Sequence, residues 1–233
     1  MKFLIPPSEG KSAENLTNIS FKNSDFRFKK QVSELLRKLK SVEDSDFKKI
    51  YGVEGNKAKS LHQLNLNINK GFCSPAINRY SGVVFSNIGF ETFDSNEKEF
   101  FNEHFLIFSG LFGMVQPMTL IPNYKLKMNV LQLYKFWKPI LTKELSNQNS
   151  IIDLLPQIHK KAYTQKDNCK NIDFVIHKND KKIPAGHFGK AVKGKFIRFI
   201  CKNQFTSFED FIQFEEDGFK WDGKVFMKNQ ITI

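Results

Sequence analysis

The chain has few cysteines and lacks the spacings that build a metal or redox motif. Cys73, Cys169 and Cys201 are far apart, and none belongs to a C-x-x-C pair. This pattern excludes a zinc ribbon or a thioredoxin-like motif and predicts free, buried thiols. The five histidines show no H-x-x-x-H pairing. We therefore predict no metal site and no cofactor.

The chain also lacks segments that would divide or export it. It has no Ser/Gly/Pro-rich linker, no repeat and no low-complexity block, and its 25 phenylalanines run from Phe3 to Phe226. This dispersal favours one domain spanning residues 1–233. Only four apolar residues precede Pro6, too few for the core of a signal peptide. A cytoplasmic location is therefore expected.

Charge is absent from the stretch between His104 and Lys125, which is unusual for a soluble domain unless the segment is buried. A bilayer span needs about 20 consecutive apolar residues. This stretch is interrupted by polar residues, glycines and a proline, namely Ser109, Gly110, Gly113, Gln116, Pro117 and Thr119. It reads as a buried strand followed by turns, so no membrane partner is expected.

Arginine is scarce: Arg27, Arg37, Arg79 and Arg198 are the four arginines among 36 basic residues. The net charge of +12 suggests a polyanionic partner, because lysines that neutralise phosphates release counterions. An AT-rich genome also produces excess lysine, but scattered along the chain. Residues 181–208 instead hold seven basic residues and no Asp or Glu. This clustering favours a functional surface.

Hydrophobic periodicity and turn residues predict strands and helices in irregular order. Strands are expected over residues 1–5, 82–88, 105–109, 150–155 and 172–178, with a closing hairpin around Asp222-Gly223. Helices are expected over residues 28–40, 46–51 (capped by Ser45), 56–64, 95–104 (capped by Ser95), 130–146, 188–203 and 207–214 (capped by Ser207). This mixture predicts a mixed α/β (α+β) fold, an irregular single domain with a mixed sheet.

The segment PPSEGKS, residues 6–12, is the first candidate site. It ends in Gly-Lys-Ser like a phosphate-binding P-loop, but Ile5 stands where the first glycine of that motif belongs. A nucleotide triphosphatase is therefore not indicated. Ser8 and Lys11 still follow a strand, at the place where open sheets commonly bind ligands. A solvated turn is the alternative interpretation.

The segment FSGLFG, residues 108–113, is the second candidate. No glycine lies two places before Ser109, so the nucleophile elbow of serine hydrolases is not indicated. Gly110 and Gly113 permit close approach of another element or of a ligand, and packing is the commoner cause. Nearby, Tyr124 lies among the cations Lys125 and Lys127, a pattern that suits phosphate contact and base stacking. A half-buried tyrosine at a strand end is the alternative.

A basic helix over residues 186–204 is the third candidate. One face of this helix is apolar and holds Phe196, Phe199 and Ile200. Cations occupy much of the remaining surface, namely Lys190, Lys193, Lys195, Arg198 and Lys202. Cations placed this way hold phosphates without reading sequence. A solvated face is the competing explanation.

Residues 48–61 partly match a helix-hairpin-helix, whose turn grips a phosphate backbone with amide groups. Gly52-Val53 and Ala58 fit the pattern, but Glu54 stands where the second glycine is expected. An ordinary connection between two helices is the alternative. The helix pair around Lys193 and Ser207 is an equal candidate for such a hairpin.

Several of these motifs together resemble the YaaA family. The resemblance covers the loop with Pro7, Ser8 and Lys11; SGLFG with Pro117, Pro122, Tyr124 and Met128; LYKFW at residues 133–137; Lys190 with Lys193-Gly194; and FEEDGFKWD near the end. It implies a cytoplasmic protein of the peroxide response that limits iron-driven damage. It also implies a mixed α/β fold with a basic cleft and a helix-hairpin-helix that binds duplex or branched DNA.

The sequence and the resemblance together predict a monomeric DNA-binding stress protein with weak sequence preference. We expect DNA contacts from Lys11, Lys125, Lys127, Lys190, Lys193, Lys195, Arg198 and Lys202, in a basic cleft lined by Ser8, Ser109, Gly110, Tyr124 and Arg79. The alternative is an enzyme that acts on a nucleotide-sized anion in the same cleft, where lysine and tyrosine would supply acid–base groups; its residues would be Ser8, Lys11, Ser109, Tyr124 and Lys190. No catalytic motif decides between the two, and a protein-binding surface is a third possibility.

Overall fold

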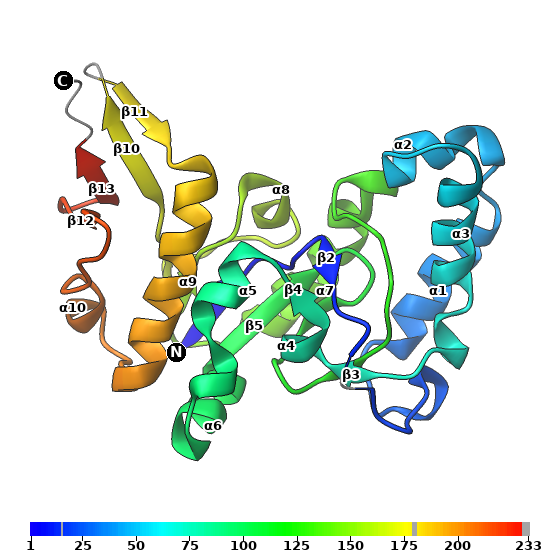
Figure 1. Ribbon diagram of the computed structural model, residues 1–233, viewed down its shortest axis with the longest axis horizontal. Helices are drawn as coiled ribbons and strands as arrows, with labels where there is room; N and C mark the ends of the chain where they lie inside the picture. Colours follow the sequence, from blue (N-terminus) through cyan, green and yellow to red (C-terminus); the bar gives the residue numbers. More distant parts are fainter. Residues whose placement is uncertain (15, 179–180, 230–233) are drawn as a thin grey trace.

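The computed structural model describes residues 1–14, 16–178 and 181–229 and has the mixed α/β fold that the sequence predicts. Figure 1 shows helices α1–α3 gathered at one end, a five-stranded sheet at the centre, and a four-stranded sheet with α9 and α10 at the other end. In the described part of the chain, no helix is long and apolar enough to cross a bilayer.

The central sheet has the order β6-β5-β1-β8-β9. Its strands are β1 (Lys2–Ile5), β5 (Phe105–Ser109), β6 (Gly113–Val115), β8 (Ile151–Asp153) and β9 (Cys169–Asn171). β1 pairs in parallel with β5 and β8, β9 pairs in parallel with β8, and β6 is antiparallel to β5. The carboxyl ends of four strands therefore lie along one edge of the sheet, where ligands commonly bind.

The second sheet has the order β11-β10-β13-β12, with β10 (Phe174–Lys178), β11 (Lys181–Pro184), β12 (Lys220–Trp221) and β13 (Phe226–Asn229). Two short antiparallel ladders join β2 (Gly10–Lys11) to β4 (Tyr80–Ser81) and β3 (Ser74–Pro75) to β7 (Leu120–Ile121). The predicted hairpin around Asp222-Gly223 is confirmed by the pairing of β12 with β13.

The described helices are α1 (Lys29–Lys40), α2 (Phe47–Tyr51), α3 (Gly55–Leu66), α4 (Ala76–Arg79), α5 (Val83–Ile88), α6 (Ser95–His104), α7 (Leu133–Leu145), α8 (Gln157–Lys160), α9 (Gly186–Asn203) and α10 (Phe208–Phe211). The predictions for α1, α3, α9 and the Ser207 cap of α10 are confirmed, as are the strands β1, β5, β8 and β10. Short 3₁₀ turns occupy residues 21–23, 44–46, 68–70, 90–92 and 130–132.

One predicted strand is wrong, because residues 83–88 form the helix α5. Gly82 (φ 112°) and Gly89 (φ 63°) bound this helix, and its buried residues Val84, Phe85 and Ile88 follow helical spacing. A run of six residues with β-branched and aromatic side chains suits either structure, and here packing against α9 favours the helix.

Two caps and one helix start also differ from prediction. Asp94, rather than Ser95, caps α6, since its carboxylate accepts from the Glu97 amide while the Glu97 side chain accepts from the Asp94 amide. Ser45 lies inside the 3₁₀ turn of residues 44–46 and caps no helix. The helix predicted from residue 130 begins at Leu133, because residues 131–132 have left-handed backbone angles.

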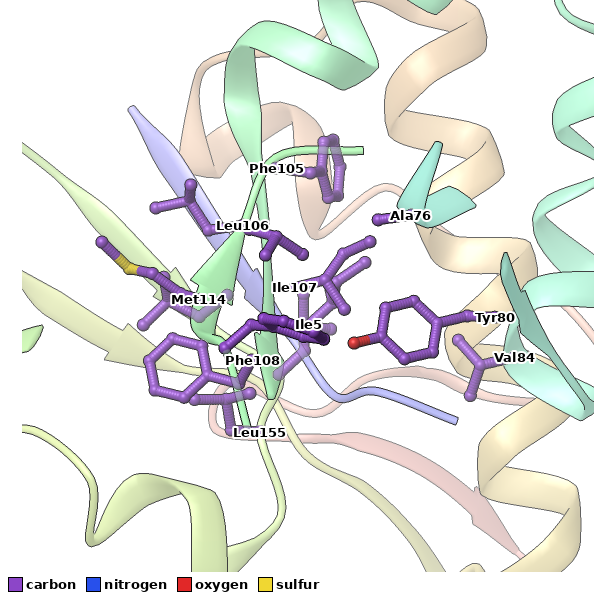
Figure 2. Close-up of a cluster of buried hydrophobic side chains, with 14 of the residues drawn as sticks. Ile5, Ala76, Tyr80, Val84, Phe105, Leu106, Ile107, Phe108, Met114 and Leu155 are labelled. Atoms are coloured by element: carbon purple, nitrogen blue, oxygen red, sulfur yellow. The ribbon is translucent and has the colours of Figure 1, made fainter. Parts of the chain in front are cut away.

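The core is built around the central strands. Figure 2 shows Ile5 and Ile107 of β1 and β5 packed with Phe108, Leu155 and Tyr80, whose ring points into the cluster. All three cysteines are free; Cys73 and Cys201 are buried as predicted, whereas Cys169 is only half-buried.

Candidate functional site

The loop after β1 is fixed in place by the β2–β4 ladder. Gly10 pairs with Ser81 and Lys11 pairs with Tyr80. The Ser8 hydroxyl donates a hydrogen bond to the Ser81 carbonyl oxygen. Gly82 is required there, because it has a φ of 112° and a Cβ at that position would lie 2.9 Å from Ser8 Oγ. The carboxyl end of β1 thus holds Lys11 against a second segment of the chain.

Lys11 has an unusual environment for a lysine. Its Nζ lies 4.2 Å from the centroid of the Tyr124 ring and 5.4 Å from that of Tyr80, and it donates to the Ser8 carbonyl oxygen at 3.1 Å. Burial lowers the pKa of Lys11 to about 7, and the positive charge of Lys125 adds to this effect. At neutral pH, Lys11 is therefore a neutral amine in a substantial fraction of the protein molecules.

A chain of three buried hydroxyl groups lies beside this amine. The Ser109 hydroxyl is 2.8 Å from the Tyr124 hydroxyl, which is 2.8 Å from the Tyr80 hydroxyl. The Phe112 amide donates to Ser109 Oγ at 2.9 Å. Burial raises the pKa of Tyr124 to about 12 and that of Tyr80 well above its usual value. Both tyrosines therefore remain protonated and can donate hydrogen bonds.

Two predicted cations form the rim of this cluster. The Glu9 carboxylate lies 2.7 Å from Lys127 Nζ and 3.5 Å from Lys125 Nζ, and the hydrogen bond from Lys127 lowers the pKa of Glu9. The Asn65 side chain of α3 holds the Lys125 backbone, accepting from its amide and donating to its carbonyl oxygen, both at 2.8 Å. Glu9 lies within the predicted loop, but nothing in the local sequence marks Asn65 as a neighbour of Lys125.

Arg79 is buried in the structure, with 1% of its surface exposed. Its guanidinium donates to the carbonyl oxygens of Ser12 and Phe72. Arg79 therefore binds two chain segments together beneath the loop instead of presenting a charge at a cleft surface.

Gly110 and Gly113 serve packing. A Cβ on Gly110 would lie 2.6 Å from the Leu126 carbonyl oxygen, and a Cβ on Gly113 would lie 2.7 Å from the Trp137 ring. The Trp137 indole N–H also donates to the Gly110 carbonyl oxygen at 2.9 Å. The motifs SGLFG and LYKFW are thus two halves of one packed unit, which fixes Ser109 next to Tyr124.

Four of the five cations predicted on the 186–204 helix contact groups of the chain itself in the structure. Lys193 donates to the Leu154 carbonyl oxygen, Lys195 pairs with Glu216 and Asp217, Arg198 donates to the carbonyl oxygens of residues 88 and 89, and Lys202 pairs with Glu97. Burial lowers the pKa of Lys193 to about 8. Lys190 is exposed. The groups that bind these cations lie far away in the sequence. The absence of Asp and Glu from the helix itself therefore does not show that its cations are unpaired.

The α2–α3 connection forms a tight, exposed turn. Gly52 (φ 72°) and Gly55 (φ 60°) both have left-handed backbone angles, and a Cβ at either position would meet nothing within 4 Å. Ile50 and Ala58 anchor the two helices in the core below the turn. Gly55 lies one residue after the position where a helix-hairpin-helix would have its second glycine.

Two described cavities lie outside the Lys11 cluster. One, of about 220 Å³, is next to the α2–α3 turn. The other, of about 600 Å³, is open and lined by lysines, amides and hydroxyls, namely Lys138, Gln157, Lys160, Lys161, Tyr163, Thr164, Gln165 and Asn171, together with Asp173. Behind it, buried Asp153 accepts from Tyr163, Gln165 and the Leu155 amide, so its hydrogen-bonding capacity is used within the protein.

Comparison with known proteins agrees with the motif resemblance. The family described as peroxide stress protein YaaA matches residues 1–225. A UPF0246 protein of Fusobacterium nucleatum is 26% identical over 229 residues, covering 94% of this chain and 92% of the relative. A UPF0246 protein of Francisella philomiragia is 25% identical over 249 residues, covering 98% of each.

Proposed function

Because this chain belongs to the family of the peroxide stress protein YaaA, we propose that it acts in the peroxide response by binding DNA. The proposed ligand is duplex or branched DNA, held through phosphate contacts with weak sequence preference. Bound protein would limit iron-driven damage by covering the DNA where the oxidant forms. The net charge of +12 supports a polyanionic partner.

The observation that carries this proposal is the α2–α3 turn. Its two left-handed glycines, Gly52 and Gly55, have open space beside them, so their backbone can approach a phosphate closely. The turn leads into the N-terminus of α3, where amide groups and the helix dipole favour an anion. This arrangement supports the function of a helix-hairpin-helix.

Exposed lysines surround the turn. Lys48 pairs with Glu54 and Lys59 pairs with Asp44, each at the solvent-exposed surface. Lys49 and Lys57 are also exposed, and in the described part of the chain neither forms an ion pair. We therefore place the main phosphate contacts at this turn and assign a smaller role to α9, whose cations are occupied by internal partners.

The test replaces Lys49 and Lys57 together by alanine and measures duplex affinity across a salt series. We expect weaker binding and a plot of log affinity against log salt that is shallower by about two phosphate contacts, roughly 0.9 per contact. The control replaces Lys135 and Lys138, two exposed lysines of α7, and removes the same charge elsewhere. Equal effects of the two pairs would contradict a localised contact at the turn.

A second candidate function is favoured by the environment of Lys11. A half-buried amine with a pKa of about 7, next to two protonated tyrosines, resembles the general bases and nucleophiles of enzymes. An enzyme acting on a nucleotide-sized anion would use this cluster, with Lys125 and Lys127 near its edge.

A further inference from the structure

We propose that the Lys11 amine forms an imine with an aldehyde carried on a sugar phosphate, as in the open-chain abasic deoxyribose of damaged DNA. The inference rests on the proposed function where the aldehyde comes from DNA, since DNA binding would bring the abasic sugar to Lys11. A free sugar phosphate has the same aldehyde and phosphate groups and is the second possible source of the ligand. Oxidative attack on DNA releases bases and leaves such aldehydes, which fits a protein of the peroxide response.

The Lys11 amine is not neutralised by a partner. Among the residues that the structure describes, no carboxylate lies within ion-pair distance of Lys11; Glu9 pairs with Lys125 and Lys127 instead. By contrast, Lys195 and Lys202 each contact a carboxylate within 3 Å. Aromatic rings and a carbonyl oxygen surround Lys11, so its environment provides no full negative charge in contact with the ammonium form.

An imine requires a neutral amine, and here the fold supplies one. A pKa of about 7 leaves about half of the Lys11 side chains unprotonated at pH 7, whereas a lysine at 10.5 is neutral in fewer than about one molecule in a thousand. Lys193 also has a lowered pKa, of about 8. Glu9 favours the ammonium form of Lys11 as Asp173 and Asp153 favour that of Lys193, but the Lys193 Nζ also donates to the Leu154 carbonyl oxygen at 2.5 Å, against 3.1 Å from Lys11 to Ser8. Lys11 is therefore the better nucleophile.

The surroundings of Lys11 also fit the phosphate of such a ligand. Lys125 and Lys127 are held beside the loop by the exposed Glu9 carboxylate, 65% of whose side chain is accessible. An exposed carboxylate can swing away, so a phosphate can take its place between the two ammonium groups. The site lies at the carboxyl end of β1, along the sheet edge where four parallel strands end.

Imine formation from the Lys11 amine and an aldehyde requires no oxidant or reductant. The neutral amine adds to the aldehyde carbon, the C=O π electrons move to oxygen, and the nitrogen proton passes to that oxygen to give a carbinolamine. A second proton, taken from solvent, converts the hydroxyl to water, which leaves with its bonding pair and yields a protonated imine. Addition of water reverses both steps and frees Lys11.

The experiment traps this imine on the full-length protein with sodium cyanoborohydride, which adds hydride to the imine carbon and makes the bond permanent. One arm uses a labelled duplex with a single abasic site, and a second uses the intact duplex. A third uses free 2-deoxyribose 5-phosphate, with the adduct located by peptide mass spectrometry. We expect a covalent adduct at Lys11 with the abasic duplex and none with the intact duplex.

Lys11→Arg is the decisive variant, because arginine is a cation of similar length that has no primary amine. Its adduct yield should fall to the background level of a protein that has no reactive lysine. Lys166→Met, which removes an exposed lysine of a distant loop, should not change the yield. In the parent, the rate should rise about fivefold from pH 6 to pH 7 and level off above pH 8.

The outcomes separate this inference from the proposed function. Equal adduct yields for parent and Lys11→Arg, or no adduct from abasic DNA and free sugar phosphate alike, would overturn the imine even if DNA binds tightly. Lys11-dependent capture of the free sugar phosphate by a protein that binds no DNA would uphold the imine and overturn DNA binding. Capture of abasic DNA supports both.

Discussion

At the scale of single residues, Lys11 is disfavoured as a cation by the fold that surrounds it. Burial removes water from the amine, and Lys125 and Arg79 add like charge nearby. The two tyrosine rings compensate only in part, because cation–π contacts contribute about 0.5–2 kcal/mol. Such a group reduces the stability of the folded protein at pH values where the unfolded chain carries the proton.

This cost makes the stability of a Lys11→Met variant depend on pH. The folded-state pKa of about 7 lies below the unfolded value of 10.5, so between these values the unfolded chain binds more protons and the parent gains stability as pH rises. The variant should be more stable than the parent at pH 7 and below, by at most a few kcal/mol at about 1.4 kcal/mol per pKa unit. The difference should vanish toward pH 10.5. Urea unfolding at several pH values measures it, and a constant difference would refute the pKa of Lys11.

Which residues meet at this site was partly predictable from the sequence. Ser8, Lys11, Ser109 and Tyr124 come together in part because the loop with Ser8 and Lys11 follows β1, while Ser109 ends β5, the adjacent parallel strand. Asn65 was not predictable, since it reaches the site from α3 through a contact 60 residues away in sequence. Side-chain partners of this kind depend on tertiary packing and leave no local pattern.

At the scale of elements, the close contact between α5 and α9 explains why Gly194 lies within a helix. A Cβ at Gly194 would lie 2.4 Å from the Val84 carbonyl oxygen and 2.6 Å from Asn87 Cβ. The same contact explains why residues 83–88 are helical although their composition also suits a strand. The sequence shows six residues of mixed polarity between two glycines. It does not show that α9 packs against them and favours a helix.

Gly194→Ala should therefore destabilise the protein although alanine favours helices. The added methyl group forces α5 and α9 apart, and such overpacking costs about 1–3 kcal/mol, more than the gain of about 1 kcal/mol in helix propensity. Lys190→Ala, an exposed substitution in the same helix, is the matched control and should change stability little. Thermal melting of both variants measures the effect, and a more stable Gly194→Ala would contradict the contact.

At the scale of the whole molecule, the charge of +12 overstates the cations available to DNA. Seven of the eight predicted DNA contacts donate to a group of the chain itself, through Glu9, Glu97, Glu216, Asp217 or backbone carbonyl oxygens. Except for Ser8, the partner of Lys11, these partners come from distant segments, so composition and clustering predicted a basic protein but did not show which of its cations are paired. The mixed fold was predictable, because it follows from local periodicity.

Under the proposed DNA-binding function, the same distribution of charge predicts weak discrimination among DNA sequences. Bidentate arginine is the commonest reader of guanine. Of the four arginines, Arg79 is buried, Arg198 is bound to α5 and its C-terminal turn, Arg27 pairs with Glu144, and Arg37 is exposed on α1. We expect duplexes of unrelated sequence to bind with affinities that differ by less than about tenfold, the effect of one good base contact. For each duplex, log affinity should fall linearly with log salt, with the same slope. Competition binding with several duplexes at three salt concentrations tests both, and a strong preference with a shallow slope would show that base contacts dominate.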